Sequence, residues 1–438
     1  MRRKYPKPLL GFLAVLFLLG ATIFLQACSK KEEELPEKAE SETKMETIEF
    51  KMPETCRGCH PVIFAEWEAS LHRIAFIDPL YWAEAELAGK EAGAEVRDFC
   101  HSCHAAAASM VEKIPADATK ASPLAKAGVP CDLCHSITEV KKIGNRNIVV
   151  ETASNTKRGP YKDSFSPYHL TEYSEIHTKA EFCAACHNVY HPANGLPIEK
   201  PYDEWKEGPY AKDGIVCQDC HMTPGPQVVK PNPGQVAVGG PMREHYYTHS
   251  TIGGNAFITQ YMGIEKGYQI AVERLKSAAR LEIEDFSLSG SNASLKVKVT
   301  NVGAGHYLPT GLTVMRQMWL HVVVKDASGK VLFESGQLDG EGNIDEKAVI
   351  YHTVYADKNG NPTEKVWEAE KILKDYRIPP KESVTETFSF ILPAGIKRPL
   401  SISVELLYRS APQHIVNKLM KDRPEVPVIQ MAAVEKSF

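Results

Sequence analysis

The stretch Cys217-Gln218-Asp219-Cys220-His221 decides the fold of much of this chain, because its pattern of two thiols and one imidazole recurs along the sequence. The other copies are Cys56-Arg57-Gly58-Cys59-His60, Cys100-His101-Ser102-Cys103-His104, Cys131-Asp132-Leu133-Cys134-His135 and Cys183-Ala184-Ala185-Cys186-His187. Together they use ten of the 11 cysteines in the 438 residues. Five copies of Cys-x-x-Cys-His are too many to be accidental.

The Cys-x-x-Cys-His pattern indicates covalent attachment of a c-type haem. Two thiols meet the two vinyl groups on one edge of the porphyrin, and the next side chain then lies beneath the iron. A zinc ribbon pairs two Cys-x-x-Cys units and needs no histidine after each, and a disulfide framework needs none either. We therefore expect five haem c groups on Cys56, Cys59, Cys100, Cys103, Cys131, Cys134, Cys183, Cys186, Cys217 and Cys220, with proximal iron ligands His60, His104, His135, His187 and His221.

The sixth position of each iron decides the function, since two imidazoles give an electron carrier and an open position gives a potential catalyst. Of the 16 histidines, eleven lie outside the motifs. We expect the distal ligands to be His72, His169, His177, His249 and His306. His101, His191 and His245 are less favoured, and His321, His352 and His414 are expected to be structural. Methionine is more often core filler, so the histidine surplus predicts bis-histidine ligation and low potentials.

The N-terminal residues predict export and a lipid anchor. Basic residues precede an apolar run from Leu9 to Leu25, which is typical of a secretory signal. Leu25-Gln26-Ala27-Cys28 resembles the bacterial lipobox, which implies lipidation of Cys28. An uncleaved N-terminal anchor is the alternative. Either way, we expect the body to be exported, attached to the inner or outer membrane and facing the periplasm or the cell surface.

The chain divides into four predicted parts. These are a signal peptide at residues 1–28, a Lys/Glu-rich disordered tether at 29–48, a pentahaem domain at 49–280 and a β-sandwich domain at 281–438. Apolar residues at three- and four-residue steps predict a helix over 264–280, and period-2 runs at 295–300, 318–324, 330–333, 384–390 and 400–406 predict strands. The fold class is therefore α+β, with a mainly helical, loop-rich haem domain before an immunoglobulin-like sandwich.

Several segments resemble a known group of multihaem cytochromes. The segments around His72 and His249 and the loop at Gly305-His306 resemble parts of bacterial multihaem lipoproteins of this group. The block from Glu204-Trp205-Lys206 to Cys217-Gln218-Asp219-Cys220-His221-Met222 resembles a recurring block in cytochromes related to the tetrahaem cytochrome of ammonia oxidisers. They are more distantly similar to the pentahaem nitrite reductases and hydroxylamine oxidoreductases. The resemblance covers residues 50 to about 410 and implies stacked haem pairs and periplasmic or outer-surface electron transfer. The nitrite reductases typically carry one motif ending in lysine, whereas all five motifs here end in histidine.

Three functions are compatible with these residues. The leading prediction is electron transfer by five haems in a membrane-anchored exported lipoprotein of anaerobic respiration. Its expected partners are other cytochromes or membrane quinol-oxidising complexes, and the formal charge of −4 gives no reason to expect nucleic acid. The alternatives are a reductase or oxidase of small nitrogen or sulfur compounds with one open haem, and a structural subunit of an extracellular conductive assembly.

Overall fold

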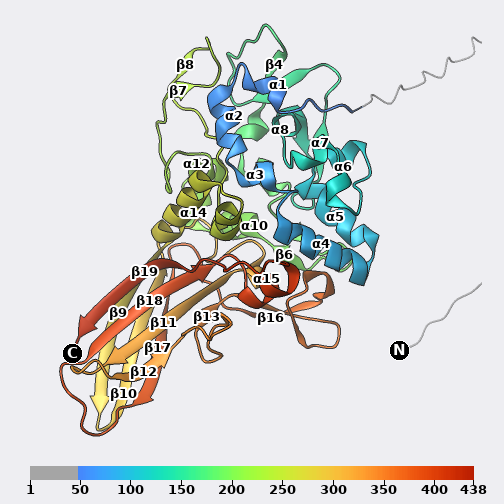
Figure 1. Ribbon diagram of the computed structural model, residues 1–438. Helices are drawn as coiled ribbons and strands as arrows, with labels where there is room; N and C mark the ends of the chain where they lie inside the picture. The colour runs from blue at the N-terminus through green and yellow to red at the C-terminus, as the bar shows by residue number, and fades with distance from the viewer. Residues whose placement is uncertain (1–47) are drawn as a thin grey trace, which may run out of the picture. The chain divides into compact units, whose positions relative to one another are not determined.

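Short helices recur throughout residues 54–278 because proline and small polar residues start new ones repeatedly (Figure 1). Proline occupies the first turn of α2, α4, α7, α10 and α11, where its missing N–H costs nothing. Asp78, the N-cap of α4, accepts hydrogen bonds from Leu80 N and Tyr81 N. This computed structural model describes residues 48–438, so the predicted signal peptide, lipobox and nearly all of the tether lie outside the described residues.

The helices have the following bounds: α1 (Glu54–Arg57), α2 (Pro61–Glu68), α3 (Leu71–Ile74), α4 (Pro79–Ala92), α5 (Ala94–His104), α6 (Ala108–Val111), α7 (Pro123–Lys126), α8 (Cys131–Ser136), α9 (Ala180–Ala184), α10 (Pro201–Glu207), α11 (Pro209–Lys212), α12 (Cys217–His221), α13 (Ala256–Tyr261), α14 (Glu265–Ala278) and α15 (Gln413–Leu419). The predicted helix at 264–280 is confirmed as α14. Ser70 caps α3 and separates it from α2. None of the helices among the described residues is long and apolar enough to cross a bilayer.

Short strand pairs connect the helices: β1 (Ile137–Val140) with β2 (Ile148–Val150), β3 (Thr156–Gly159) with β4 (Leu170–Tyr173), β5 (Val189–Tyr190) with β6 (Pro197–Glu199), and β7 (Gly234–Gln235) with β8 (Met242–Arg243). The longer strands follow α14: β9 (Ala279–Ser289), β10 (Asn292–Asn301), β11 (Gln317–Lys325), β12 (Val331–Ser335), β13 (Ile350–Tyr351), β14 (Thr353–Ala356), β15 (Pro362–Thr363), β16 (Lys371–Asp375), β17 (Ser383–Ile391), β18 (Ser401–Arg409) and β19 (Ile429–Ser437).

The long strands form two open antiparallel sheets that pack face to face. One sheet has the order β17-β10-β9, and the other has the order β12-β11-β18-β19 with β13 added beside β11. Buried and partly buried residues alternate along β18, as expected for strands with one face in a core. The shared core takes Leu295 and Val297 from the first sheet and Leu320 and Val404 from the second. The predicted α+β fold class is thus confirmed.

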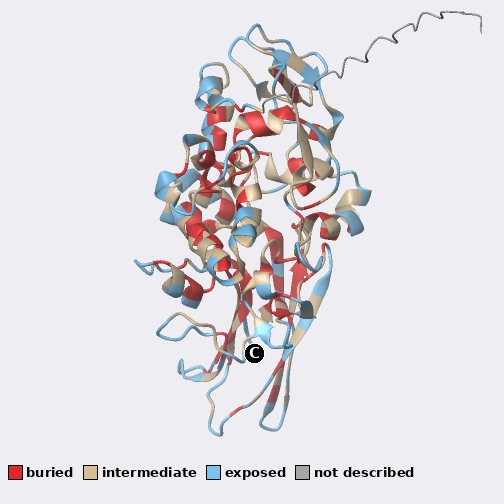
Figure 2. Ribbon diagram, turned by 90° about the vertical axis from the view of Figure 1, so that its right-hand side faces the viewer, coloured by how far each residue is buried: buried red, intermediate tan, exposed pale blue. Residues whose placement is uncertain are grey.

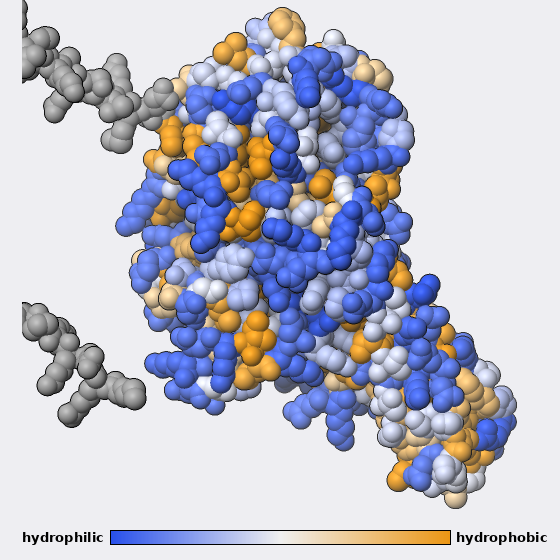
Figure 3. Space-filling model, turned by 180° about the vertical axis from the view of Figure 1, so that it is seen from behind, coloured by the Kyte–Doolittle hydropathy of each residue, from blue (hydrophilic) through white to orange (hydrophobic). Residues whose placement is uncertain are grey.

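The same apolar core continues from the sheets into the helical region (Figures 1 and 2). Ala271 and Leu275 of α14 pack with the sheet residues, and Ile252 lies fully buried in the same cluster. A second cluster joins Ile74 of α3 to Val416 of α15. Thr47–Phe438 form one compact unit, so the predicted division between residues 280 and 281 stays a prediction. Figure 3 shows mainly hydrophilic side chains on one face, with small apolar patches between them.

Candidate haem-binding site

Each Cys-x-x-Cys-His motif lies on a turn of helix. In every copy the histidine N–H donates to the carbonyl of the first cysteine, as in an α-helix, either within the helix or in the turn beside it. Residues i, i+3 and i+4 therefore share one helical face. This backbone turns both thiols and the imidazole of each motif toward the same side. All ten motif cysteines are free thiols, which is the form that attachment requires.

Backbone carbonyls hold four of the five motif histidines by Nδ1. His60 Nδ1 donates to Val236 O at 2.6 Å, and His104 Nδ1 donates to Ala75 O at 2.8 Å. Likewise, the Nδ1 atoms of His135 and His221 lie 2.6 Å from Arg158 O and 3.3 Å from Ile252 O. A carbonyl only accepts hydrogen bonds, so Nδ1 carries the proton and Nε2 presents its lone pair. That tautomer and that second-shell contact are what metal-bound histidines use.

Burial lowers the pKa of four motif imidazoles and so favours their neutral form, which iron binding also requires. Desolvation lowers the pKa of His104 to about 4 and that of His221 to about 3. It also lowers the pKa values of His135 and His187. The thiol pairs, the neutral imidazoles and the oriented Nε2 atoms together fit haem c, whose site would be formed by the motif residues.

Three motif histidines face a histidine from elsewhere in the chain at similar separations. The ring centroids of His187 and His72 lie 6.0 Å apart, those of His135 and His249 lie 6.3 Å apart, and those of His221 and His306 lie 6.3 Å apart. Two imidazoles that bind one metal from opposite sides have ring centres about 6 Å apart, because each metal–nitrogen bond is about 2 Å and the ring centre lies roughly 1 Å beyond. The three predicted distal histidines are therefore placed at ligand-pair distances.

The other two predicted distal histidines are placed differently. His177 lies 5.9 Å from His135, but its Nε2 lies 3.0 Å from Cys134 O, and its Nδ1 is buried with no hydrogen-bond partner among the described residues. His169 Nδ1 lies 3.0 Å from Leu170 O, and no motif imidazole faces it within residues 48–438. His135 thus has two candidate partner histidines, His177 and His249. The ring of His177 contacts the Cys134 carbonyl, and that of His249 does not.

The second motif has a different neighbour. The phenol ring of Tyr81 stacks on the imidazole of His104, with centroids 3.8 Å apart and planes 2° apart. The Tyr81 hydroxyl also lies 2.6 Å from Nδ1 of His101, which is fully buried. Among the described residues, no second histidine ring faces His60 or His104 in the way seen for the other three motifs. His101 is therefore occupied by its contacts with Tyr81 and Trp82 of α4 and with Phe76.

Thiols of different motifs lie close enough to shift each other's pKa. The neighbouring pairs are Cys56 with Cys131, Cys103 with Cys186, and Cys183 with Cys217. The first motif is therefore adjacent to the third, and the fourth is adjacent to both the second and the fifth. This closeness fits a protein in which each motif has too few residues around it to form a separate hydrophobic core.

The loop that carries His306 is fixed by a buried carboxylate of α10. Glu204 accepts hydrogen bonds from Tyr307 N at 3.1 Å and from the Thr310 hydroxyl at 2.7 Å. Its other oxygen lies 2.5 Å from Arg377 Nη1, and the two side chains are only 2% and 3% exposed. His306 Nδ1 meanwhile donates to Tyr307 O at 2.9 Å. The sequence analysis missed the roles of Glu204 and Arg377, because nothing in the local pattern connects them to a histidine.

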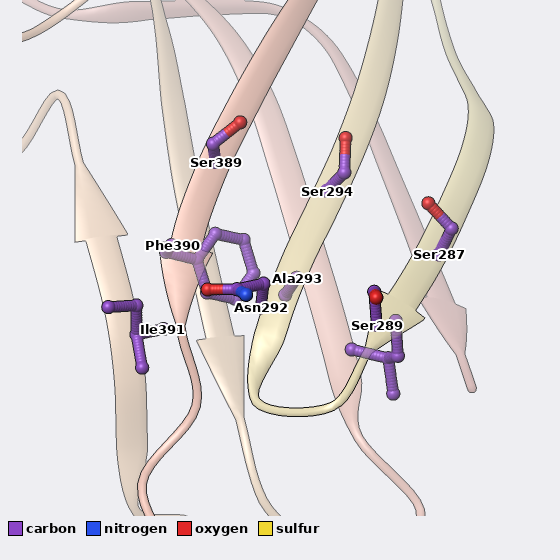
Figure 4. Close-up of a pocket in the computed structure, with 9 residues that line it drawn as sticks. Ser287, Ser289, Asn292, Ala293, Ser294, Ser389, Phe390 and Ile391 are labelled. Atoms are coloured by element: carbon purple, nitrogen blue, oxygen red, sulfur yellow. The ribbon is translucent and has the colours of Figure 1, made fainter.

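One hollow in the structure lies away from the motifs, on the three-stranded sheet (Figure 4). It is lined by Ser287, Leu288, Ser289, Asn292, Ala293, Ser294, Ser389, Phe390 and Ile391 of β9, β10 and β17 and the turn that joins β9 to β10. These side chains include no thiol, imidazole or carboxylate. The hollow therefore has none of the chemistry of the motif sites.

Comparisons with known proteins agree with this geometry. The family model described as "Cytochrome c554 and c-prime" matches residues 55–136, which contain the first three motifs. The solved structure of a penta-haem cytochrome c552 from Thermochromatium tepidum shares the fold, with a TM-score of 0.63 and 20% identity over 89% of this chain and 99% of that chain. A β-glucosidase from Kluyveromyces marxianus matches 36% of this chain and 14% of its own, but its TM-score of 0.15 and 13% identity carry no weight.

None of the curated proteins compared with the chain matches it. The motifs, the family match across three of them and the shared fold support the assignment of this chain to the multihaem c-type cytochromes.

Proposed function

We propose that this protein is an electron carrier with five covalently bound haem c groups. The pairing of buried imidazoles is the observation that carries the proposal. The haem iron supplies reversible one-electron chemistry when it is bound. The chain's part is to attach each group through two thiols, to orient the imidazole beneath it through a carbonyl, and to keep that imidazole neutral by burial.

The proposed ligands follow from the geometry. His60, His104, His135, His187 and His221 serve as proximal ligands. His72 completes the fourth site, His249 the third and His306 the fifth. His169 and His177 remain predicted ligands. The closeness of thiols from different motifs supports closely spaced groups, which electron transfer between them requires.

The cellular setting belongs to the same proposal. The apolar leader and Leu25-Gln26-Ala27-Cys28 support export and lipid anchoring through Cys28, with the body in the periplasm or at the cell surface. The partners would be other cytochromes or membrane quinol-oxidising complexes in anaerobic respiration. Labelling with a radioactive fatty acid, in the wild type and in Cys28→Ala, tests the anchor. Label that persists in the variant would contradict it.

A second function is favoured by one observation. The imidazole of His104 is covered by the Tyr81 ring, and no second imidazole faces it among the described residues. A haem at this motif with an open sixth position would suit a reductase or oxidase of small nitrogen or sulfur compounds.

Electron paramagnetic resonance of the oxidised, haem-loaded protein, integrated by spin state, separates the two functions. Five low-spin signals mean that every sixth position is filled and that the protein is a carrier. A high-spin signal that changes on addition of nitrite or hydroxylamine would replace the carrier proposal by the enzymatic one.

A further inference from the structure

One loop, His249–Ile252, lies against the imidazoles of His135, His221 and His72. We call it the ligand-holding loop. His249 faces His135 at 6.3 Å, and Ile252 O lies 3.3 Å from His221 Nδ1. Between them, the Thr251 hydroxyl lies 3.2 Å from His72 Nδ1. A single short segment thus fixes groups that belong to the third, fourth and fifth motifs.

The backbone of this loop is strained at Thr251. Its φ is +26°, on the left-handed side of the Ramachandran map, where a β-branched residue is a genuine outlier. Such conformations cost on the order of 1–3 kcal/mol and persist only where the surrounding structure enforces them. Glycine would adopt this backbone conformation more readily than threonine. The presence of threonine therefore points to a role for its side chain.

Contacts on both sides hold the loop in this conformation. On one side, His249 N donates to Glu66 Oε2 at 2.9 Å, and Glu66 is only 7% exposed. Thr248 N donates to Met222 O at 2.9 Å. On the other side, Ile252 is fully buried in the core that α14 shares with the sheets. The hydroxyl of Thr251 is therefore presented to His72 by a rigid frame.

We propose that Thr251 is a positioning residue for His72 and lowers the reduction potential of the haem held by Cys183 and Cys186. This inference rests on the proposed function, in which His72 binds that iron opposite His187. With Nε2 on the iron, Nδ1 of His72 carries a proton and donates it to the Thr251 hydroxyl. A hydrogen bond of this kind fixes the ring orientation and makes the imidazole a stronger electron donor, which favours the oxidised iron.

Spectroelectrochemical titration of the full-length, haem-loaded protein tests the proposal. Thr251→Val keeps the shape of the side chain and removes the hydroxyl, so one midpoint potential should rise while the others stay. Thr251→Ser keeps the hydroxyl and should leave all potentials near the wild-type values. Thr248→Val is the matched control, because the buried hydroxyl of Thr248 has no hydrogen-bond partner among the described residues.

Thr251→Gly covers the case in which the valine variant does not load haem. It removes the hydroxyl and accepts the left-handed backbone, so it should raise the same midpoint potential. If Thr251→Gly or Thr251→Val loads its haems and moves no potential, the positioning role is overturned. A rise of equal size in Thr248→Val would overturn it as well.

His72→Ala separates this inference from the proposed function. A new high-spin haem in His72→Ala, together with unchanged potentials in the threonine variants, would overturn the role of Thr251 alone. No new high-spin haem in His72→Ala would mean that His72 is not an iron ligand, and both the assignment and the inference would fall.

Discussion

The imidazoles of His221 and His306 face each other with ring centroids 6.3 Å apart and planes at 20°, although α12 provides one and the loop after β10 provides the other. The β-rich region therefore supplies a candidate ligand to the last haem motif. On the proposed ligation, this region would be part of the haem site and not merely a structural module packed beside it.

Replacing His306 tests this relationship directly. His306→Ala should convert one haem to the high-spin form, because the iron at His221 would lose its second imidazole. Integrated electron paramagnetic resonance measures the change. His321→Ala is the control, since His321 contacts Glu334 and Glu405 on the sheet and no motif imidazole. A wild-type spectrum for His306→Ala would contradict the assignment.

The number of haems can be tested by removing one motif. The double variant Cys100→Ser/Cys103→Ser should carry four haems where the wild type carries five, because each pair of thioether bonds holds one group. Mass spectrometry of the intact denatured protein counts the groups that are covalently attached. A wild-type mass with fewer than five haems would show that one of the motifs is not used.

Breaking the buried ion pair between Glu204 and Arg377 should destabilise the protein strongly. Arg377→Met leaves the Glu204 carboxylate without its charge partner at 2% exposure, and such losses cost about 3–5 kcal/mol. Chemical unfolding measures the change. Glu204→Gln/Arg377→Met should be less damaging than the sum of the two single variants, because the side chain at position 204 then carries no charge that lacks a partner.

An exposed ion pair offers the control for that cycle. Arg280 and Glu282 lie 3.3 Å apart with 62% and 47% of their side chains exposed, so removing Arg280 should change the free energy of unfolding by about 0–1 kcal/mol. Equal losses at both sites would mean that burial of the Glu204–Arg377 pair has no special consequence.

The stability of the fold should fall as the pH rises through the titration of Glu84. Burial, followed by repulsion from Glu364, raises the pKa of Glu84 to about 7, above the value of about 4.3 in an unfolded chain. The folded state therefore binds the proton more tightly than the unfolded state. The contribution of Glu84 to the free energy of unfolding declines between about pH 4.3 and 7, by at most about 1.4 kcal/mol per pH unit. Glu84→Gln should be more stable than the wild type at pH 8 and about equal to it at pH 4.

Glu91, on the same helix, should make the stability depend on pH in the opposite direction. A hydrogen bond from Lys365 lowers its pKa, so its contribution is present above the unfolded pKa and is lost on acidification. Glu91→Gln should therefore lose stability at pH 8. Guanidinium unfolding at both pH values compares the two variants, and a loss of stability at pH 8 in Glu84→Gln would contradict the prediction.

The sequence predicted the parts of this protein that follow from local patterns. The five motifs, the helix α14 and the strands β10, β11, β17 and β18 all depend on short-range spacing. The physical cause of each of these features lies within a few neighbouring residues, so one sequence was enough to predict them.

Long-range pairings could not be predicted in this way. The partner of each motif histidine depends on how distant segments fold together, as with His72 and His187 or His135 and His249. Thr251 gave no signal because its importance lies in a left-handed backbone and a contact with His72. Glu204 gave none because its partners, Tyr307, Thr310 and Arg377, come from another part of the chain.

The anchoring of the His306 loop by Arg377 has a consequence for biosynthesis. A chain is synthesised from its N-terminus, so the thiols of Cys217 and Cys220 exist before Arg377 has been made. With His306 as the proposed second ligand, the fifth site would reach its final coordination only after the strands that follow have folded. A chain truncated before those strands would then carry all of its attached groups and an incomplete last site, so the C-terminal region would complete the assembly.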